Sequence, residues 1–225
     1  MTFLDSKQVS EHYQGEKGEQ YVHRLSDANS WGYELNYRWF KPYLKSTDVV
    51  LDFGCGNGGM LRLIKMDVAG VDGLEVNPTA AAIARQSGTR IFESIEEIQK
   101  CHYDVVVSNS VLEHVRDVCS TLEALRQVIK PGGLFVTKLP IDDARAAYQR
   151  GWSRDDIDHH LQTWTPRLFA NVLYESGYEV KECRIITSAW HPRLFWTRRL
   201  RLHRLAFWAF AVVKRRRVFL AVAST

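Results

Sequence analysis

The chain has 225 residues, 45% of them hydrophobic and 25% charged, with a formal net charge of +4 at pH 7. Such values are typical of an ordinary globular protein and suit one sizeable α/β domain. The four cysteines are scattered without Cys-x-x-Cys spacing, which argues against a disulfide framework or a zinc site and favours a reducing compartment. The first residues lack a basic-then-apolar signal pattern, so we expect a cytoplasmic protein.

Residues 1–45 precede the first core strand and alternate between polar and aromatic side chains. They are too aromatic for a disordered leader, because disordered segments carry few aromatic residues. We predict that this segment forms helices that lie over the binding cleft of the domain.

The stretch that says most about function covers residues 49–61. Its apolar start predicts a strand buried on both faces, which ends at Asp52 and a cluster of glycines. Because Gly54, Gly56 and Gly58 lack Cβ atoms, the backbone can turn tightly and a ligand can approach it closely. Helical spacing resumes at Met60, so the turn presents backbone N–H groups at a helix N-terminus. We therefore predict a binding loop for a nucleotide-like ligand.

The acidic residue before the glycines distinguishes between two such ligands. With Gly59, the loop also matches the Gly-x-Gly-x-x-Gly pattern of dinucleotide-binding enzymes, so the glycines alone do not decide. A carboxylate at Asp52 would repel a pyrophosphate, but it suits a ligand with an ammonium or sulfonium charge. The string from Asp52 to Gly58 resembles motif I of the class I S-adenosylmethionine-dependent methyltransferases.

The second strand is predicted over residues 68–75, where Asn77 and Pro78 break the pattern. In a parallel sheet, an acid at the end of this strand lies near the loop of the first strand and can accept both ribose hydroxyls. Glu75 fits the family's Gly-(Val/Ile)-(Asp/Glu)-x-x-Pro pattern, and Asp72 is the alternative.

A short third strand over residues 90–92 leads to Ser94 and Ile95. In the family, this junction places a polar and an apolar side chain against the adenine. The usual polar residue is Asp, so Ser94 departs from the pattern and can equally be the cap of the next helix.

Residues 103–109 form a near-continuous apolar strand, which Leu112-Glu113-His114 follows. This string resembles the signature of small-molecule methyltransferases, which include the ubiquinone-pathway O-methyltransferases. Later elements are a Pro-Gly-Gly turn at 130–133, strands over 134–139 and 178–187, a helix capped by Thr165, and a seventh strand over 218–222.

The resemblance covers about residues 45–187 and implies an α/β fold. The sheet should be Rossmann-like, seven-stranded and mostly parallel, with helices on both faces. We divide the chain into a lid (1–45), a methyltransferase core (46–187) with an acceptor-loop insertion (140–165), and a basic amphipathic extension (188–225).

The resemblance also implies that the cofactor is S-adenosyl-L-methionine. Asp52 and Gly54 would hold its methionine end and Glu75 its ribose, while Asn109 and Ser110 would border the methyl-transfer side. The full set of expected cofactor-binding residues is Asp52, Gly54, Cys55, Gly56, Gly58, Glu75, Val76, Ser94, Ile95, Asn109, Ser110 and Tyr21. Tyr21 is the lid aromatic of this set, although it can equally pack the lid onto the sheet.

Methyl transfer to oxygen needs a base near neutral pH, which a histidine can supply. The candidates are His114, His159 and His160. His114 can instead orient a loop through hydrogen bonds, and the other two can be solvated or packing residues. We expect no metal site in the insertion, because adjacent histidines point in different directions. The insertion is predicted to bind the acceptor.

The end of the chain is strongly basic, since ten of the 30 Lys and Arg residues and none of the 26 acids follow Glu182. Its apolar run over 205–213 is too short to cross a bilayer. A basic helix with Leu, Phe and Trp between the charges predicts contact of residues 193–217 with an anionic membrane surface, as a peripheral protein of its inner face. The alternative is a helix that packs on the domain and exposes a basic face.

We therefore predict a methyltransferase that acts on a small-molecule, lipid or glycan acceptor, at oxygen. One alternative is a fold relative that binds the cofactor or a partner protein without turnover. The other is an RNA methyltransferase that uses the basic tail. The chain shows no nucleic-acid-binding module, and the residues after Asn109 do not read Pro-Pro-aromatic as in exocyclic-amine DNA methyltransferases, so nucleic acid is disfavoured as a partner.

Overall fold

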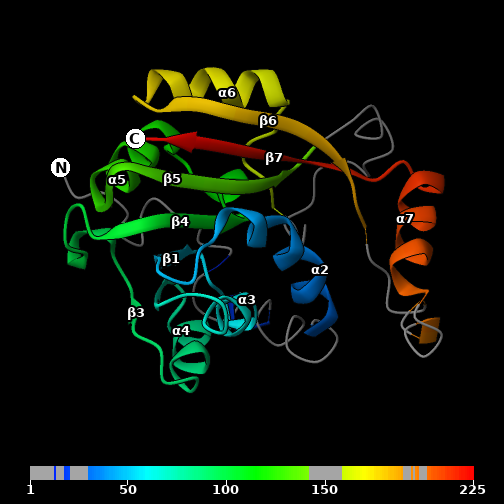
Figure 1. Cartoon of the computed structure of the whole chain (residues 1–225), viewed down its shortest axis with the longest axis horizontal. Helices are drawn as coiled ribbons and strands as arrows, with labels where there is room; N and C mark the ends of the chain where they lie inside the picture. The colour runs from blue at the N-terminus through cyan, green and yellow to red at the C-terminus, as the bar shows by residue number, and fades with distance from the viewer. Residues whose placement is uncertain are drawn as a thin grey trace.

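The computed structural model describes residues 13, 18–20, 30–141, 159–189, 194, 196–197 and 202–225. They form one seven-stranded sheet of order β3-β2-β1-β4-β5-β7-β6 (Figure 1). The strands are β1 Val49–Phe53, β2 Gly70–Leu74, β3 Ile91–Phe92, β4 Tyr103–Asn109, β5 Ile129–Pro140, β6 Glu179–Thr187 and β7 Arg217–Ser224. Strands from β3 to β5 are parallel, and only β7 is antiparallel to its neighbours β5 and β6. The predicted mostly parallel sheet is confirmed.

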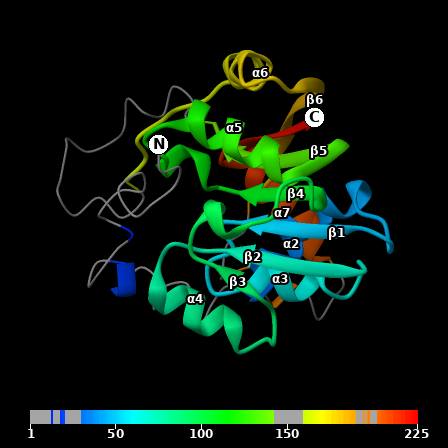
Figure 2. The ribbon, with the colours of Figure 1, turned by 90° about the vertical axis from the view of Figure 1, so that its left-hand side faces the viewer.

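Helices cover both faces of the sheet, as predicted. They are α2 Ser30–Phe40, α3 Gly59–Ile64, α4 Pro78–Arg85, α5 Val118–Val128, α6 Pro166–Glu175 and α7 His203–Val213, with 3-10 turns η2 Lys41–Tyr43, η3 Ile95–Glu97 and η4 Leu112–His114. Side chains of α2 and α3 pack against one face, around Val50 and Val107. Those of α5 and α6 pack against the other, around Phe135 and Phe219. Figure 2 shows α4 beside the β2–β3 end of the sheet.

Helix ends follow from individual side chains. The Thr165 hydroxyl accepts the Leu168 N–H at 3.3 Å and caps α6, as predicted. Asn77 caps α4 in the same way, because its side-chain oxygen accepts the Ala80 N–H at 3.0 Å. Gly177, with φ +84°, follows α6 and lets the chain reverse into β6.

The predicted turn at 130–133 lies within β5 rather than before it. β5 begins at Ile129, and its register with β4 shifts between Tyr103 and Val105. Gly132, with φ +75°, permits this irregularity. The pairing of β5 with β4 is therefore interrupted at this turn, while β5 continues as one strand.

The C-terminal segment contributes a strand to the interior of the sheet. β7 contains the predicted strand over 218–222 and pairs with both β6 and β5. Val218 lies opposite Pro140, the last residue of β5. Consequently α7, which precedes β7, ends beside the carboxyl edge of the parallel strands (Figure 1).

Candidate active site

The loop after β1 is the first part of the site. Gly54, Gly56 and Gly58 have φ values of +72°, +54° and +77°, a region that favours glycine. The N–H groups of Gly54 and Cys55 both donate to the Leu74 carbonyl, at 2.9 and 3.1 Å. The loop is thus tied to the carboxyl end of β2, where the second set of predicted cofactor residues lies.

The glycines differ in what surrounds them. A Cβ atom at Gly54 would lie 2.4 Å from the side chain of Val111, and one at Gly59 would lie 2.0 Å from the Tyr33 ring. At Gly56, a Cβ atom would meet nothing within 4 Å. Two of the glycines therefore permit close packing of the chain on itself, whereas Gly56 faces open space that a ligand can occupy.

Helix α2 holds the loop from the other side. The Tyr33 hydroxyl donates to the side-chain oxygen of Asn57 at 2.8 Å, and the Gly59 N–H donates to the same oxygen at 3.2 Å. Sequence reasoning missed Tyr33 and Asn57. The aromatic richness of residues 1–45 was the available signal, but the predicted lid aromatic was Tyr21 rather than Tyr33.

Two acidic side chains face the loop. Asp52 is 1% exposed, and its Oδ2 has no hydrogen-bond partner within the described part of the chain. Burial, with a smaller effect of the nearby Glu75 charge, raises the pKa of Asp52 to about 7. Glu75 accepts the N–H groups of Gly56 and Asn77, each at 2.8 Å. Burial raises the pKa of Glu75, and these backbone donors oppose the shift.

The alternative acid on β2 has a different partner. Asp72 on β2 accepts the hydroxyl of Tyr103 on β4 at 2.9 Å, across β1, which lies between these two strands. Glu75, rather than Asp72, is the acid that is hydrogen-bonded to the glycine loop.

The predicted adenine contacts have local roles in the structure. Ser94 caps η3, because its hydroxyl accepts the Glu96 N–H at 3.2 Å and its own N–H donates to Glu97 at 3.0 Å. Ile95 is 4% exposed and belongs to the hydrophobic core, while Val76 packs partly buried against that core. The capping role of Ser94 that the sequence left open is present, and the adenine contact stays a prediction.

The end of β4 forms the other side of the site. The side-chain oxygen of Asn109 is buried and has no hydrogen-bond partner among the residues described. Ser110 is exposed with φ +58°, and its N–H donates to the Lys138 carbonyl at 2.9 Å. The positive φ of Ser110 turns the chain sharply out of the strand toward η4.

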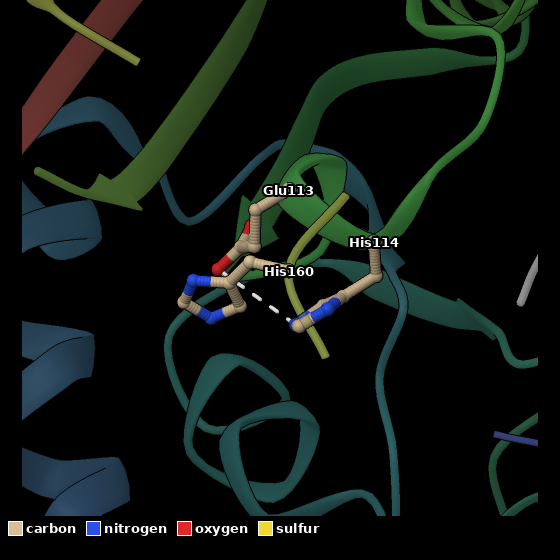
Figure 3. Close-up of side chains that lie close together, drawn as sticks. All are labelled: Glu113, His114 and His160. Atoms are coloured by element: carbon tan, nitrogen blue, oxygen red, sulfur yellow. Dashed lines mark ion pairs between the residues drawn. The ribbon is translucent and has the colours of Figure 1, made fainter. Parts of the chain in front are cut away.

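A carboxylate and two histidines gather beyond this turn (Figure 3). The rings of His114 and His160 are 5.0 Å apart between centroids, and His114 Nε2 lies 3.9 Å from a Glu113 carboxylate oxygen. One ligand atom from each of these three residues lies within 4.8 Å of the others, so they could hold a metal ion. His159, with φ +38°, directs the chain into this cluster but is not a member of it.

Hydrogen bonds from neighbouring segments hold the cluster together. The N–H groups of Leu161 and Gln162 donate to the Glu113 carbonyl at 2.8 and 3.1 Å. The Tyr13 hydroxyl lies 2.9 Å from His114 Nδ1, and the Tyr13 carbonyl accepts the Asn77 side-chain N–H at 2.6 Å. Tyr13 therefore joins the β2 end to η4. The predicted lid residue Tyr21 lies outside the described residues.

Comparison with known proteins agrees with this arrangement. A family profile described as a methyltransferase domain matches residues 20–182. A ubiquinone biosynthesis O-methyltransferase from Rickettsia canadensis is 30% identical over 152 residues, which cover 60% of this chain and 64% of that relative. The matched region thus spans less than two thirds of the relative's length.

Solved structures share the fold. A SAM-dependent methyltransferase from Archaeoglobus fulgidus aligns with a TM-score of 0.64 at 15% identity, over 93% of this chain and all of that one. Phosphoethanolamine N-methyltransferase 2 of Haemonchus contortus, in complex with phosphomonomethylethanolamine and S-adenosylhomocysteine, gives 0.65 at 14%, over 93% of this chain and 58% of that one. At such identities the likeness concerns the fold alone. Because the family profile covers more than half of the chain, the protein belongs to the methyltransferase domain family, with the fold of the class I S-adenosylmethionine-dependent methyltransferases.

Proposed function

We propose that this protein transfers a methyl group from S-adenosyl-L-methionine to an oxygen atom of a small-molecule, lipid or glycan acceptor. The observation that carries the proposal is the buried, unpaired oxygen of Asp52 beside the open space at Gly56. A buried carboxylate without a partner is costly, and a cationic ligand compensates for it. The ammonium of the cofactor's methionine end is such a ligand.

The residues around the loop fit this cofactor. Asp52 and the N–H groups of the glycine loop would hold the amino and carboxyl groups of its methionine end, and Glu75 would accept the ribose hydroxyls. Each Glu75 oxygen already accepts one backbone N–H, which fixes its orientation and leaves a second lone pair for a hydroxyl. When bound, the cofactor supplies an electrophilic methyl group. The protein aligns the acceptor and removes its proton.

His114 is the proposed base. It follows β4 at the methyl-transfer side, and the Tyr13 hydroxyl near Nδ1 fixes the ring. His160, which is exposed beside it, is the second candidate and can pass the proton to solvent. The name of the Rickettsia canadensis relative supports oxygen as the acceptor atom.

Release of S-adenosylhomocysteine tests the proposal. The purified protein would be incubated with a limiting concentration of the cofactor and a lysate-derived metabolite pool. Asp52→Asn is the variant with weakened cofactor binding, and Asp72→Asn is the matched control outside the site. We expect release by the wild type and by Asp72→Asn, and much less release by Asp52→Asn. Cofactor binding by calorimetry without any release would instead support a non-catalytic fold relative.

We further propose that residues 193–217 contact an anionic membrane surface. On α7, Leu205, Trp208 and Val212 lie at i, i+3 and i+7 and are 46–60% exposed, while Phe207 and Ala211 on the opposite side are buried. The exposed basic residues 214–217 follow directly. Within the described ranges, no helix is long and apolar enough to cross a bilayer. An apolar stripe next to positive charge instead suits a helix that lies in the surface of the membrane.

Vesicle flotation tests this contact. Because β7 lies inside the sheet, removal of the whole tail would disrupt the fold, so the test replaces Leu205, Trp208 and Val212 with Ser. We expect the wild type, but not the triple variant, to float with vesicles that contain phosphatidylglycerol. Equal flotation of both proteins would reject the contact, and salt-sensitive RNA binding in place of flotation would favour the RNA alternative.

A further inference from the structure

Lys138 is the only buried Lys or Arg side chain in the part of the chain that the structure describes. It lies on β5, between β4 and β7, with 5% of its surface exposed. An ammonium group in the interior of a sheet loses several kcal/mol of hydration unless charged or polar partners replace the water. The buried Lys138 ammonium therefore needs either a compensating negative charge or a ligand that pairs with it.

The pleat of the sheet shows where Lys138 lies. It pairs with Asn109 on β4, two residues beyond the pair of Val107 and Val136, which belong to the core packed under α2 and α3. Asp52 pairs with Val107 and therefore lies on the same face. Lys138 and Asn109 thus lie on the same face as Asp52, two residues nearer to the carboxyl edge of the strands, where the candidate site is.

The polar groups around this position are incompletely matched. The Asn109 side-chain oxygen is buried without a partner among the described residues. Burial lowers the pKa of Lys138 to about 8, and the carboxylate of Glu113, itself 1% exposed, opposes that shift. Among the residues that the structure describes, Glu113 is the charged group that opposes this shift, and it belongs to the turn that carries the proposed base, His114.

The site therefore has a negatively charged part around the glycine loop and a positively charged group at the end of β5. Asp52 and Glu75 are carboxylates that suit the cationic methionine end and the ribose of the cofactor. Lys138 adds a cation on the predicted methyl-transfer side, where the sulfonium of a bound cofactor would also be positive. Two positive groups on one side repel each other unless an anion lies between them.

We propose that Lys138 anchors an anionic group, a carboxylate or a phosphate, on the methyl acceptor. This inference rests on the proposed function and specifies its substrate class. Lys138 binds the anion and so positions the acceptor hydroxyl toward the methyl group and toward His114. Glu113 balances the charge of Lys138 until the acceptor arrives, and Asn109 beside it offers a hydrogen-bond acceptor to the same molecule.

Calorimetric titration with small anions tests the proposal. Benzoate, phenyl phosphate and the neutral benzamide would be titrated into the protein with and without S-adenosylhomocysteine. The variants are Lys138→Met, Lys138→Arg, and Lys130→Met as a control lysine at the start of the same strand. We expect the wild type to prefer an anion over benzamide, and Lys138→Met to weaken that anion about tenfold to hundredfold, as loss of a charged hydrogen bond predicts. Lys138→Arg should restore part of the affinity, and Lys130→Met should match the wild type.

The outcomes separate this inference from the proposed function. Equal binding of S-adenosylhomocysteine by all variants would show that the fold and the cofactor site are intact. In that case, equal anion affinities of the wild type and Lys138→Met would overturn the inference. No anion binding by the wild type would overturn it as well. If anions bind through Lys138 while S-adenosylhomocysteine does not bind, the anion site stands and the proposed function fails. The better of the two anions assigns the acceptor as a carboxylate or a phosphate compound.

Discussion

The two halves of the candidate site are built in different ways. On the cofactor side, residues 52–59 and 75–77 are close in sequence and meet because β1 and β2 are adjacent parallel strands. On the acceptor side, Tyr13 and His114 are 101 residues apart, and His160 reaches the same cluster from beyond β5. The first half needs one strand–helix–strand unit, β1–α3–β2, whereas the second brings together residues as far apart as 13 and 160.

The halves also differ in chemistry. The cofactor side carries buried carboxylates and glycines with positive φ, a combination that suits one cationic ligand. The acceptor side carries histidines, a buried lysine and a carboxylate, which can serve several acceptors. Since many chemistries share one fold, we expect the first half to decide the cofactor and the second to decide the substrate. Mutations that separate binding from turnover test this division.

The largest expected effect is on turnover, at His114. If His114 is the base, His114→Ala should lower the rate of S-adenosylhomocysteine release about 10²- to 10⁴-fold while cofactor affinity stays unchanged. His160→Ala should have a smaller effect, and His159→Ala, outside the cluster, should have the least. Calorimetry and the release assay on the same samples check this. A loss of cofactor affinity in His114→Ala would mean that the residue holds the loop rather than the proton.

The same assay examines the cluster for a metal. Our proposal uses His114 as a base, so release should continue in the presence of a chelator. If the chelator stops release and an added divalent cation restores it, Glu113, His114 and His160 act as ligands and the base must be sought elsewhere.

The next largest effect is on cofactor binding, at Asp52. Its pKa of about 7 means that the carboxyl is protonated below neutral pH, when it cannot pair with an ammonium group. Cofactor affinity should therefore rise as the pH increases from about 6 to 8, by up to about tenfold per pH unit below the pKa. Asp52→Asn should weaken binding about tenfold to hundredfold at pH 8 and flatten this dependence. Asp72→Asn is the matched control on β2.

Asp52 should also lower the stability of the ligand-free protein. Because its folded pKa lies above the ordinary 3.8, the unfolded chain releases this proton first as the pH rises. Stability should therefore decrease between about pH 4 and 7. Asp52→Asn removes this cost, so its melting temperature at pH 8 should exceed that of the wild type. A lower melting temperature would show that the carboxylate is already compensated without ligand.

The contrast between the two halves of the site also explains which residues could be predicted from the sequence, because the cofactor half is local in sequence and the acceptor half is not. Asp52, the glycines and Glu75 lie in a local pattern, and the strand–turn–helix that this pattern requires is present. His160 could be named as a candidate, but its meeting with Glu113 depends on how residues 159–162 pack on η4, which no local spacing encodes. Lys138 could not be predicted from the sequence, because only the register of β5 with β4 shows that it lies beside Asn109.

Substitutions of the glycines should have a third, smaller effect. They distinguish a glycine that is needed for packing, Gly54, from one that borders space for the ligand, Gly56. Gly54→Ala should cost about 1–3 kcal/mol of stability, because φ is +72° and the new methyl would contact Val111. The double variant with Val111→Ala should recover part of this loss. Gly56→Ala meets open space and should cost only about 1–2 kcal/mol, from its positive φ. Its main effect should be loss of cofactor affinity, measured by calorimetry beside chemical denaturation.

The smallest expected effect concerns the choice between the two candidate ribose ligands, Asp72 on β2 and Glu75 just after it. Tyr103→Phe removes the hydrogen bond to Asp72 and should cost about 1 kcal/mol of stability without changing cofactor affinity by more than about twofold. Burial raises the pKa of Tyr103, so its hydroxyl stays a donor throughout the usable pH range and the result should not depend on pH. Glu75→Gln should weaken cofactor affinity about tenfold, because the charge that attracts the ribose hydroxyls is lost. It should also cost about 1–3 kcal/mol of stability, because both carboxylate oxygens accept backbone N–H groups and an amide offers only one acceptor oxygen. If instead Tyr103→Phe weakened cofactor binding as much as Glu75→Gln, Asp72 rather than Glu75 would be the ribose ligand.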